Sequence, residues 1–116
     1  MRMTTVRTED GRVVCARCAL ATTFWSRFHG LMGRASLADD EGMLFRPAGS
    51  VHMFFMRFAI DVVFCDRELV VLKVVHDLGP WKMASQRGAK VAIELEVGAA
   101  AGLAPGDRLV LDTIEG

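Results

Sequence analysis

Residues 50–66 read Ser50-Val51-His52-Met53-Phe54-Phe55-Met56-Arg57-Phe58-Ala59-Ile60-Asp61-Val62-Val63-Phe64-Cys65-Asp66. Val, Ile and Phe dominate this stretch, and such residues are typical of strands. Alternate residues of an extended chain point to opposite faces, and here both alternating sets are largely apolar. We therefore expect two strands, residues 51–58 and 60–65, that are covered on both sides.

Short apolar runs bounded by Gly, Pro or Asp recur on either side of this stretch. They cover residues 43–45, 69–76, 91–97 and 108–114, each of strand length. Residues 4–8 and 12–20 are predicted to form a hairpin with Asp10-Gly11 at the turn, and Pro105-Gly106 suits a type II turn. Strands without long helices between them favour an antiparallel barrel or sandwich over β-α-β units.

One segment has helical periodicity. Thr22 or Thr23 is a suitable N-cap. The apolar residues after it recur at i, i+1, i+4, i+7 and i+8, namely Phe24, Trp25, Phe28, Leu31 and Met32. The predicted fold class is therefore mainly β: a compact antiparallel β barrel or sandwich with one principal α-helix at about residues 22–32. A short helical turn is expected at about residues 98–103.

Composition limits the kind of protein. The 116 residues, 52% of them hydrophobic and 24% charged, predict one domain spanning residues 1–116. Fourteen basic and fourteen acidic residues give zero formal net charge, which argues against a nucleic-acid partner. No apolar run approaches the ~20 residues that span a bilayer. The absence of a signal peptide and the odd number of cysteines predict a cytoplasmic protein. We expect it to be a monomer or weak oligomer.

Cys15 and Cys18 form a C-x-x-C pair inside a predicted strand. Residues three apart in a strand point to opposite faces, which suits neither a redox pair nor half of a zinc site. We therefore interpret both as buried structural cysteines.

Several ionisable side chains lie inside apolar segments. Burying an unpaired charge costs several kcal/mol, so each must find a partner or line a cleft. Glu94 lies in the predicted strand 91–97, where a solvated face shared with Glu96 is the alternative. We expect a polar cleft between the helix end and the central strands, with the ligand-binding candidates Arg27, Arg34, His52, Met56, Arg57, Asp61 and Glu94.

Four interpretations of these residues compete. The leading one is a non-catalytic domain that binds a small ligand or a protein partner. The second is a small hydrolase or isomerase with Asp61 and Glu94 as acid and base, the weak catalytic candidates. The third is soft-metal binding, of copper, through His52 and Met56, with Met53 nearby. The fourth is purely structural: buried ion pairs that set strand register. We assign no cofactor and no resident metal, and the chain contains no nucleophile-elbow or phosphate-loop motif.

Four blocks of the sequence, in order, resemble one family. They are Arg27-Phe28-His29-Gly30-Leu31-Met32-Gly33-Arg34, Glu41-Gly42-Met43-Leu44-Phe45, the stretch from His52 to Phe64, and Ile93-Glu94-Leu95-Glu96-Val97-Gly98 with Gly102-Leu103-x-x-Gly106-Asp107. The chain resembles the domain of unknown function 192 family, a group of small prokaryotic single-domain proteins, over residues 18–111. The resemblance implies a mainly antiparallel β fold with one helix, and no established activity. Its motif residues here are Arg27, Gly30, Leu31, Met32, Arg34, His52, Met56, Asp61, Glu94 and Gly106.

Overall fold

A computed structural model describes residues 2–21, 36–38, 40–53 and 56–114 of the chain. All regular elements in these residues are strands. They are β1 (Met3–Thr8), β2 (Val13–Ala21), β3 (Glu41–Phe45), β4 (Ser50–His52), β5 (Ile60–Cys65), β6 (Val71–Leu78), β7 (Met83–Ser85), β8 (Val91–Leu95) and β9 (Leu109–Ile114).

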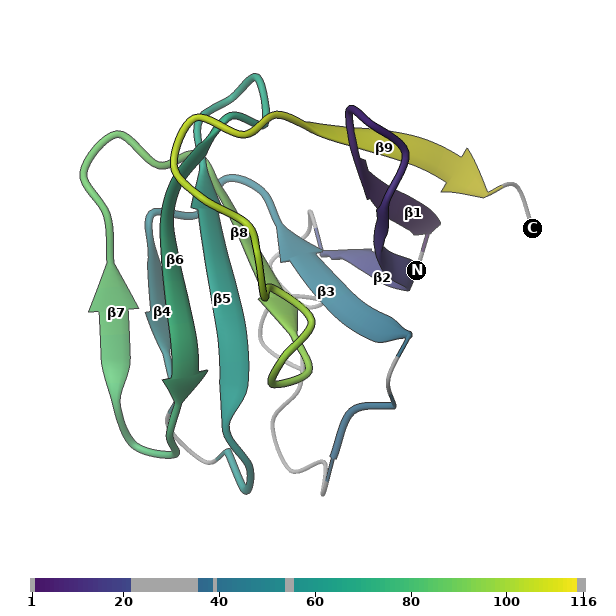
Figure 1. Ribbon diagram of the computed structural model, residues 1–116. Coiled ribbons are helices and arrows are strands. Elements are labelled where there is room, and N and C mark those ends of the chain that lie inside the picture. The colour runs from purple at the N-terminus through teal and green to yellow at the C-terminus, as the bar shows by residue number, and fades with distance from the viewer. Residues whose placement is uncertain (1, 22–35, 39, 54–55, 115–116) are drawn as a thin grey trace.

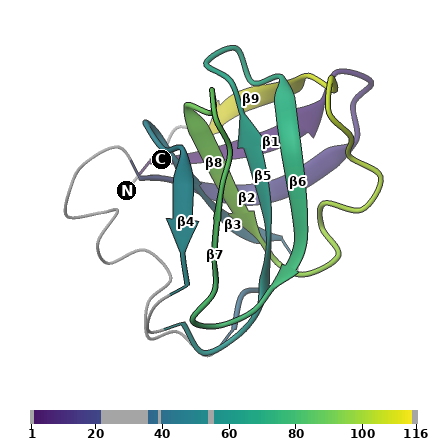
Figure 2. The ribbon, with the colours of Figure 1, turned by 90° about the vertical axis from the view of Figure 1, so that its left-hand side faces the viewer.

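Seven strands form one sheet in the order β6-β5-β8-β3-β2-β1-β9 (Figure 1). Its neighbours are antiparallel except β2 and β3, which run parallel from the Arg17–Glu41 pair to the Ala21–Phe45 pair. Strands β4 and β7 form a separate antiparallel ribbon of two strands. Figure 2 shows this ribbon in front of the large sheet, so the ribbon covers one face of it.

The mainly β character is confirmed, but the predicted antiparallel barrel or sandwich is wrong. The large sheet is mixed, and its edge strands β6 and β9 are not paired along their length. A pattern of short apolar runs carries no information on strand direction. The long connection across residues 22–40 allows β3 to enter beside β2 in the same direction, because parallel neighbours need a crossover of about a dozen residues or more.

Neither expected helix is present in the described residues. The principal helix at residues 22–32 lies outside them. Residues 98–103 form turns instead of a helical turn, with successive bonds such as Ala101 N–H to the Gly98 carbonyl (3.1 Å). Gly98 (φ 97°) and Gly102 (φ 83°) explain the difference, because a right-handed helix requires negative φ at every residue.

The large sheet is buried on both faces in its centre. All six residues of β5 and all five of β8 are buried, which confirms the prediction for residues 60–65. One face packs against the β4–β7 ribbon and includes Met43, Val62 and Phe64 (cluster 1). The other face, with Val63, Ile93 and Leu95 (cluster 2), packs against apolar residues from β1, β2 and the segment before β9.

The strand predicted over residues 51–58 is wrong. Strand β4 ends at His52, and residues 53 and 56–59 are not in a strand. The N-terminal hairpin is confirmed, with Gly11 at φ 97° in its turn. The type II turn is confirmed as well: Asp107 N–H bonds to the Ala104 carbonyl (3.1 Å) and Gly106 has φ 97°.

The two edges of the large sheet meet at one end. Val70 and Arg108 form an isolated antiparallel bridge, and Val71 N–H donates to the Asp107 carbonyl (2.7 Å). Leu109 N–H donates to the Leu69 carbonyl (2.9 Å). These bonds bring the segment before β9 and the start of β6 together, and this junction lies beside the pocket described below.

Candidate functional site

The predicted ligand-binding residues do not gather into one cleft in the part of the chain that the structure describes. Arg27 and Arg34 lie outside the described residues. His52, on β4, and Arg57 are exposed, whereas Met56 is buried in cluster 1. The predicted cleft therefore has no counterpart among the described candidates, and Asp61 and Glu94 need separate descriptions.

Asp61 is fully buried at the start of β5 and ties three segments together. Its Oδ1 accepts a hydrogen bond from Asp77 N–H (3.0 Å), and its Oδ2 accepts from Gly98 N–H (2.9 Å) and Ala100 N–H (3.2 Å). The His76 imidazole, 57% exposed, lies 3.6 Å from Oδ2. These bonds compensate the burial of the carboxylate and fix the turn at 98–100 against the sheet.

Glu94 is a second buried carboxyl group, but among the described residues it does not accept hydrogen bonds as Asp61 does. Its side chain is 7% exposed and makes no hydrogen bond or ion pair to another described residue. Burial raises the pKa of Glu94 to about 8, so the carboxyl group is largely protonated at neutral pH. The alternative of a solvated face does not describe this residue.

The sheet separates the two carboxyl groups. Asp61 is paired with Leu95 across β5 and β8, and Glu94 is paired with Val62. Paired residues share a face and successive residues alternate, so Asp61 lies on the cluster 2 face and Glu94 on the cluster 1 face. Two groups on opposite faces of a sheet cannot act on one substrate as acid and base.

Cys15 and Cys18 are buried, as predicted, but the prediction that they face opposite sides is wrong. The β1–β2 register shifts between Thr4 and Val6, and this irregularity brings both cysteines into cluster 2. The Cys15 thiol donates to the Asp40 carbonyl (3.4 Å). A hydrogen bond between the thiols lowers the pKa of Cys15, and the same bond together with burial raises the pKa of Cys18.

Two further observations limit the classes of site. Among the described residues, His, Cys, Asp and Glu nowhere gather in a group of three or more that would hold a metal ion. Nothing helical in those residues has the length and hydropathy that a membrane crossing requires.

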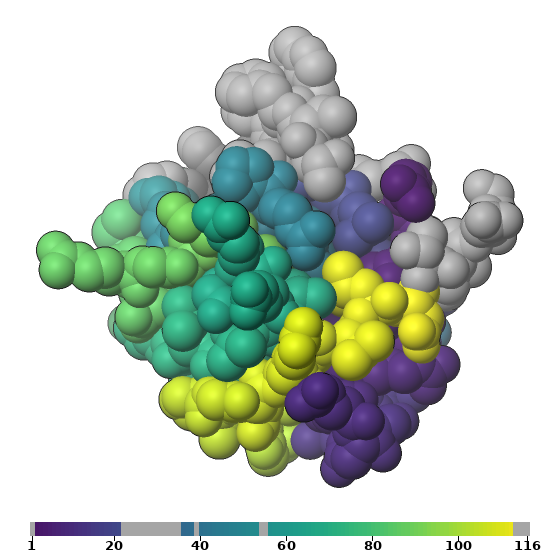
Figure 3. Space-filling model, turned by 90° about the horizontal axis from the view of Figure 1, so that it is seen from above, coloured from purple at the N-terminus to yellow at the C-terminus, as the bar shows by residue number. Residues whose placement is uncertain are grey.

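A pocket of about 330 Å³ lies between the β1–β2 turn and the segment before β9. The turn contributes Thr8, Glu9, Asp10 and Arg12, and the segment contributes Gly102, Leu103, Gly106, Asp107 and Arg108. In the space-filling view the purple N-terminal residues and the yellow C-terminal segment lie side by side at the surface (Figure 3). The pocket thus joins two regions that are far apart in sequence.

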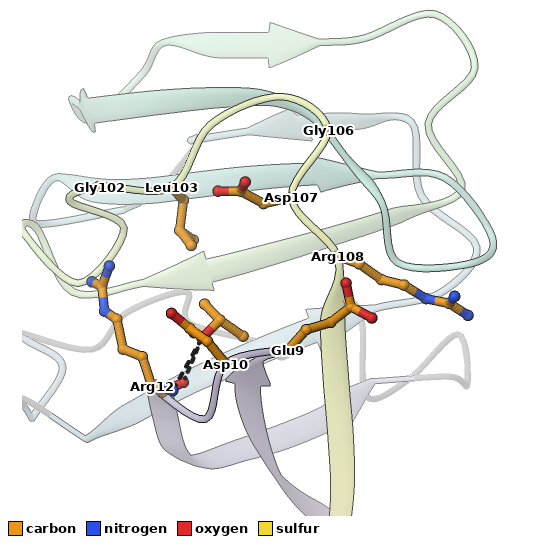
Figure 4. Close-up of a pocket in the computed structure, with 9 residues that line it drawn as sticks. Glu9, Asp10, Arg12, Gly102, Leu103, Gly106, Asp107 and Arg108 are labelled. Carbon is orange, nitrogen blue, oxygen red and sulfur yellow. Dashed lines mark hydrogen bonds between the residues drawn. The ribbon is translucent and has the colours of Figure 1, made fainter.

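Charged side chains of both signs surround this pocket (Figure 4). Arg12 Nη2 donates to the Ala99 carbonyl (3.2 Å), which holds the guanidinium group against the 98–102 turns. Asp107 Oδ2 accepts from Ala104 N–H (2.9 Å), so this carboxylate also shapes its own loop. The Thr8 hydroxyl donates to Asp10 and lowers the pKa of that carboxyl group.

Figure 4 shows the Asp107 side chain and the Leu103 side chain pointing into the pocket and the Arg108 guanidinium group pointing away from its centre. Neither Glu9 nor Arg108 makes a side-chain hydrogen bond or ion pair within the described part of the chain. The Glu9 carboxylate is therefore available to a ligand in the pocket, whereas the Arg108 guanidinium group is directed outward. The pocket presents three carboxylates and two guanidinium groups in all.

The residues of this pocket were missed because no local pattern joins them. The sequence patterns identify Asp10-Gly11 and Pro105-Gly106 only as turns, and they identify Gly102 to Asp107 only as part of a family resemblance. The available signal was the concentration of charge next to these two turns: Glu9, Asp10 and Arg12 beside the first, Asp107 and Arg108 beside the second.

Comparison with solved structures shows the same fold in two proteins. A candidate transcription regulator from Sinorhizobium meliloti 1021 superimposes with a TM-score of 0.80 at 25% identity, over 95% of this chain and 92% of that one. A protein of unknown function from Novosphingobium aromaticivorans DSM 12444 gives a TM-score of 0.78 at 29% identity, over 93% of this chain and 83% of that one.

Sequence comparison identifies the family. A UPF0127 protein from Thermococcus sibiricus is 39% identical in an alignment of 102 positions that covers 80% of this chain and 63% of that protein. This chain therefore matches less than two thirds of the length of that relative. The sequence model of the domain of unknown function 192 (DUF192) family, described as "Uncharacterized ACR", matches residues 5–111. With nearly its whole length matched, and with the four motif blocks in order, the chain belongs to the DUF192 family.

Proposed function

We propose that the protein is a non-catalytic domain that binds a small polar ligand in the pocket between the β1–β2 turn and residues 102–108. The observation that carries this proposal is the pocket of about 330 Å³ with charged side chains of both signs around it. Ligand pockets range over about 300–1,000 Å³, so this one suits a small molecule.

The charges around the pocket favour a ligand rich in hydrogen-bond donors. Glu9, Asp10 and Asp107 supply carboxylate oxygens, which accept hydrogen bonds, whereas the Arg108 guanidinium group points away from the centre. The Arg12 guanidinium group can donate a hydrogen bond to an acceptor atom of the ligand. An amine, a polyol or a zwitterion meets these requirements.

A non-catalytic role is favoured because the acid and base expected from the sequence are divided between the two faces of the sheet. Asp61 is engaged by backbone N–H groups, and Glu94 faces an apolar cluster. Neither residue lines the pocket. The proposal therefore keeps the binding role expected from the sequence and assigns it to a different set of residues.

Ligand-observed NMR with a panel of free amino acids, polyamines and monosaccharides tests the proposal. Any compound that binds is expected to lose at least about tenfold in affinity on Glu9→Gln or Arg12→Gln, since a hydrogen bond to a charged group contributes about 1.5–3 kcal/mol. Glu68→Gln and Arg87→Gln, at exposed positions outside the pocket, are the matched controls. Equal binding to all four variants contradicts the proposed site.

A further inference from the structure

The outer face of the β4–β7 ribbon carries a histidine opposite a methionine. His52 and Met83 are direct partners in the antiparallel pairing of these strands. The neighbouring pair, Val51 and Ala84, turns the other way, and Val51 is buried in cluster 1. Directly opposite residues share a face with Cβ atoms about 4.5–5.5 Å apart, so the imidazole and the thioether are neighbours on the outward face.

Met83 differs in its environment from the other methionines near this ribbon. Met53 and Met56 are 0% and 6% exposed in cluster 1, and Met43 is also buried there, whereas Met83 is 61% exposed. Burial of a Met side chain stabilises a fold, so the exposed position of Met83 contributes nothing to folding. An exposed thioether beside an exposed imidazole can coordinate a metal ion from solvent, whereas a thioether packed in the core cannot.

The two side chains form a soft donor set. Thioether sulfur selects Cu(I), imidazole nitrogen also suits copper, and hard cations such as Mg²⁺ and Ca²⁺ prefer oxygen ligands. The pair offers one nitrogen and one sulfur. The copper site expected from the sequence, through His52 and Met56, is not formed, because Met56 packs in the core while His52 is exposed.

We propose that His52 and Met83 together bind a soft monovalent cation, Cu(I) or its analogue Ag(I), on the outer face of the β4–β7 ribbon. This site shares no residue with the polar pocket, so a failure of the proposed function would not affect this proposal.

Titration with Ag(I) in chloride-free buffer tests the site, because Ag(I) has no redox chemistry there and resembles Cu(I) in its ligand preference. The readout is the methyl resonance of each methionine in protein labelled with ¹³C-methyl methionine. The Met83 resonance is expected to shift in a saturable way as Ag(I) is added. The Met53 and Met56 resonances are expected to stay in place, since both side chains are buried.

Variants separate this site from the cysteine thiols, which also bind Ag(I). The affinity of the His52–Met83 site is therefore measured from the Met83 methyl shift and not from the total heat of binding. His52→Gln is expected to weaken the binding that this shift reports by at least tenfold, and Met83→Leu is expected to abolish the matching shift of the His52 ring resonances. His76→Gln and Met3→Leu are the matched controls and are expected to bind as the unmodified protein does. An unshifted Met83 resonance, an affinity that His52→Gln leaves unchanged, or a His52 ring shift that persists in Met83→Leu overturns the proposal.

Discussion

At the scale of single residues, the same problem of a carboxyl group in an apolar strand is solved in two ways. Asp61 accepts three backbone hydrogen bonds, which compensate for the burial of its carboxyl group. Glu94 has no such donors among the described residues and is held largely protonated by burial. The hydrogen bonds of Asp61 hold neighbouring segments together. The buried Glu94 carboxyl group lowers the free energy of unfolding when the pH rises.

Asp61→Asn is expected to lower the free energy of unfolding by about 3 kcal/mol or more, because it replaces one acceptor oxygen with a donor amide facing buried N–H groups. Asp112→Asn is the matched control. Asp112 pairs with Arg7 at the surface, where such pairs contribute at most about 1 kcal/mol. Urea denaturation measures both variants, and an equal, small effect would contradict the structural role of Asp61.

Because burial raises the pKa of Glu94, we expect the free energy of unfolding to fall as the pH rises. Below pH 4.5 the carboxyl group is protonated in both folded and unfolded states, so it contributes nothing. Between pH 4.5 and about 8 the unfolded state releases the proton and the folded state keeps it, which lowers stability by about 1.4 kcal/mol per pH unit at most. Above about pH 8 the loss is complete.

Glu94→Gln is expected to remove this slope and to be more stable than the unmodified protein at pH 8.5, with little difference at pH 4.5. Urea denaturation across this range measures the effect. Glu68→Gln, at an exposed position, provides the comparison and should retain the slope. A Glu94→Gln variant that keeps the full pH dependence would show that other groups cause it.

At the scale of elements, strand β3 depends on the close approach of its neighbours at Gly42. A Cβ atom on Gly42 would lie 2.8 Å from Cys15 Sγ, 2.9 Å from the Glu94 carbonyl oxygen and 3.0 Å from Leu95 Cδ2. These atoms belong to β2 and β8, the strands on either side of β3. The missing side chain of Gly42 thus allows β2 and β8 to approach β3 closely from both sides at this residue.

Gly42→Ala is expected to cost roughly 2–3 kcal/mol in unfolding free energy, as overpacking a buried position does. Combining it with Cys15→Ala should not restore stability, because the Glu94 carbonyl oxygen is backbone and cannot move aside. Gly49→Ala, where the nearest atom is 3.4 Å from the added Cβ, is the control. Thermal and chemical denaturation of the set would decide, and full rescue by Cys15→Ala would contradict the backbone constraint.

At the scale of the whole molecule, the junction between β6 and the segment before β9 joins the two ends of the large sheet. Backbone bonds from Val71 to Asp107, from Gly106 to Val71 and from Leu109 to Leu69 make this junction. It holds the wall of the polar pocket formed by residues 102–108 against the body of the protein. Pocket geometry is therefore expected to depend on the junction.

Hydrogen exchange measures the junction directly. The amides of Val71, Gly106 and Leu109 are expected to exchange at least about 100-fold more slowly than the amide of Gly88, on the exposed turn after β7, because each donates a backbone hydrogen bond. If the junction opens readily, all four amides exchange at similar rates. That result would make the pocket a transient feature of the surface.

Local patterns were sufficient for much of the fold. The hairpin at residues 4–20, the type II turn at Pro105-Gly106 and the buried strand 60–65 followed from strand periodicity and turn chemistry, which act over a few residues. The buried position of Asp61 followed from its apolar neighbours. The family followed from four short motifs in order.

Tertiary structure alone decided the remaining features, because each depends on which strands become neighbours. Strand pairing placed Asp61 and Glu94 on opposite faces, and a register shift brought Cys15 and Cys18 together. The parallel β2–β3 pair, the His52–Met83 pair and the pocket between the two ends of the chain arise in the same way. A sequence determines which residues favour strands and turns over short distances, whereas the order and register of strands are settled by packing between distant segments.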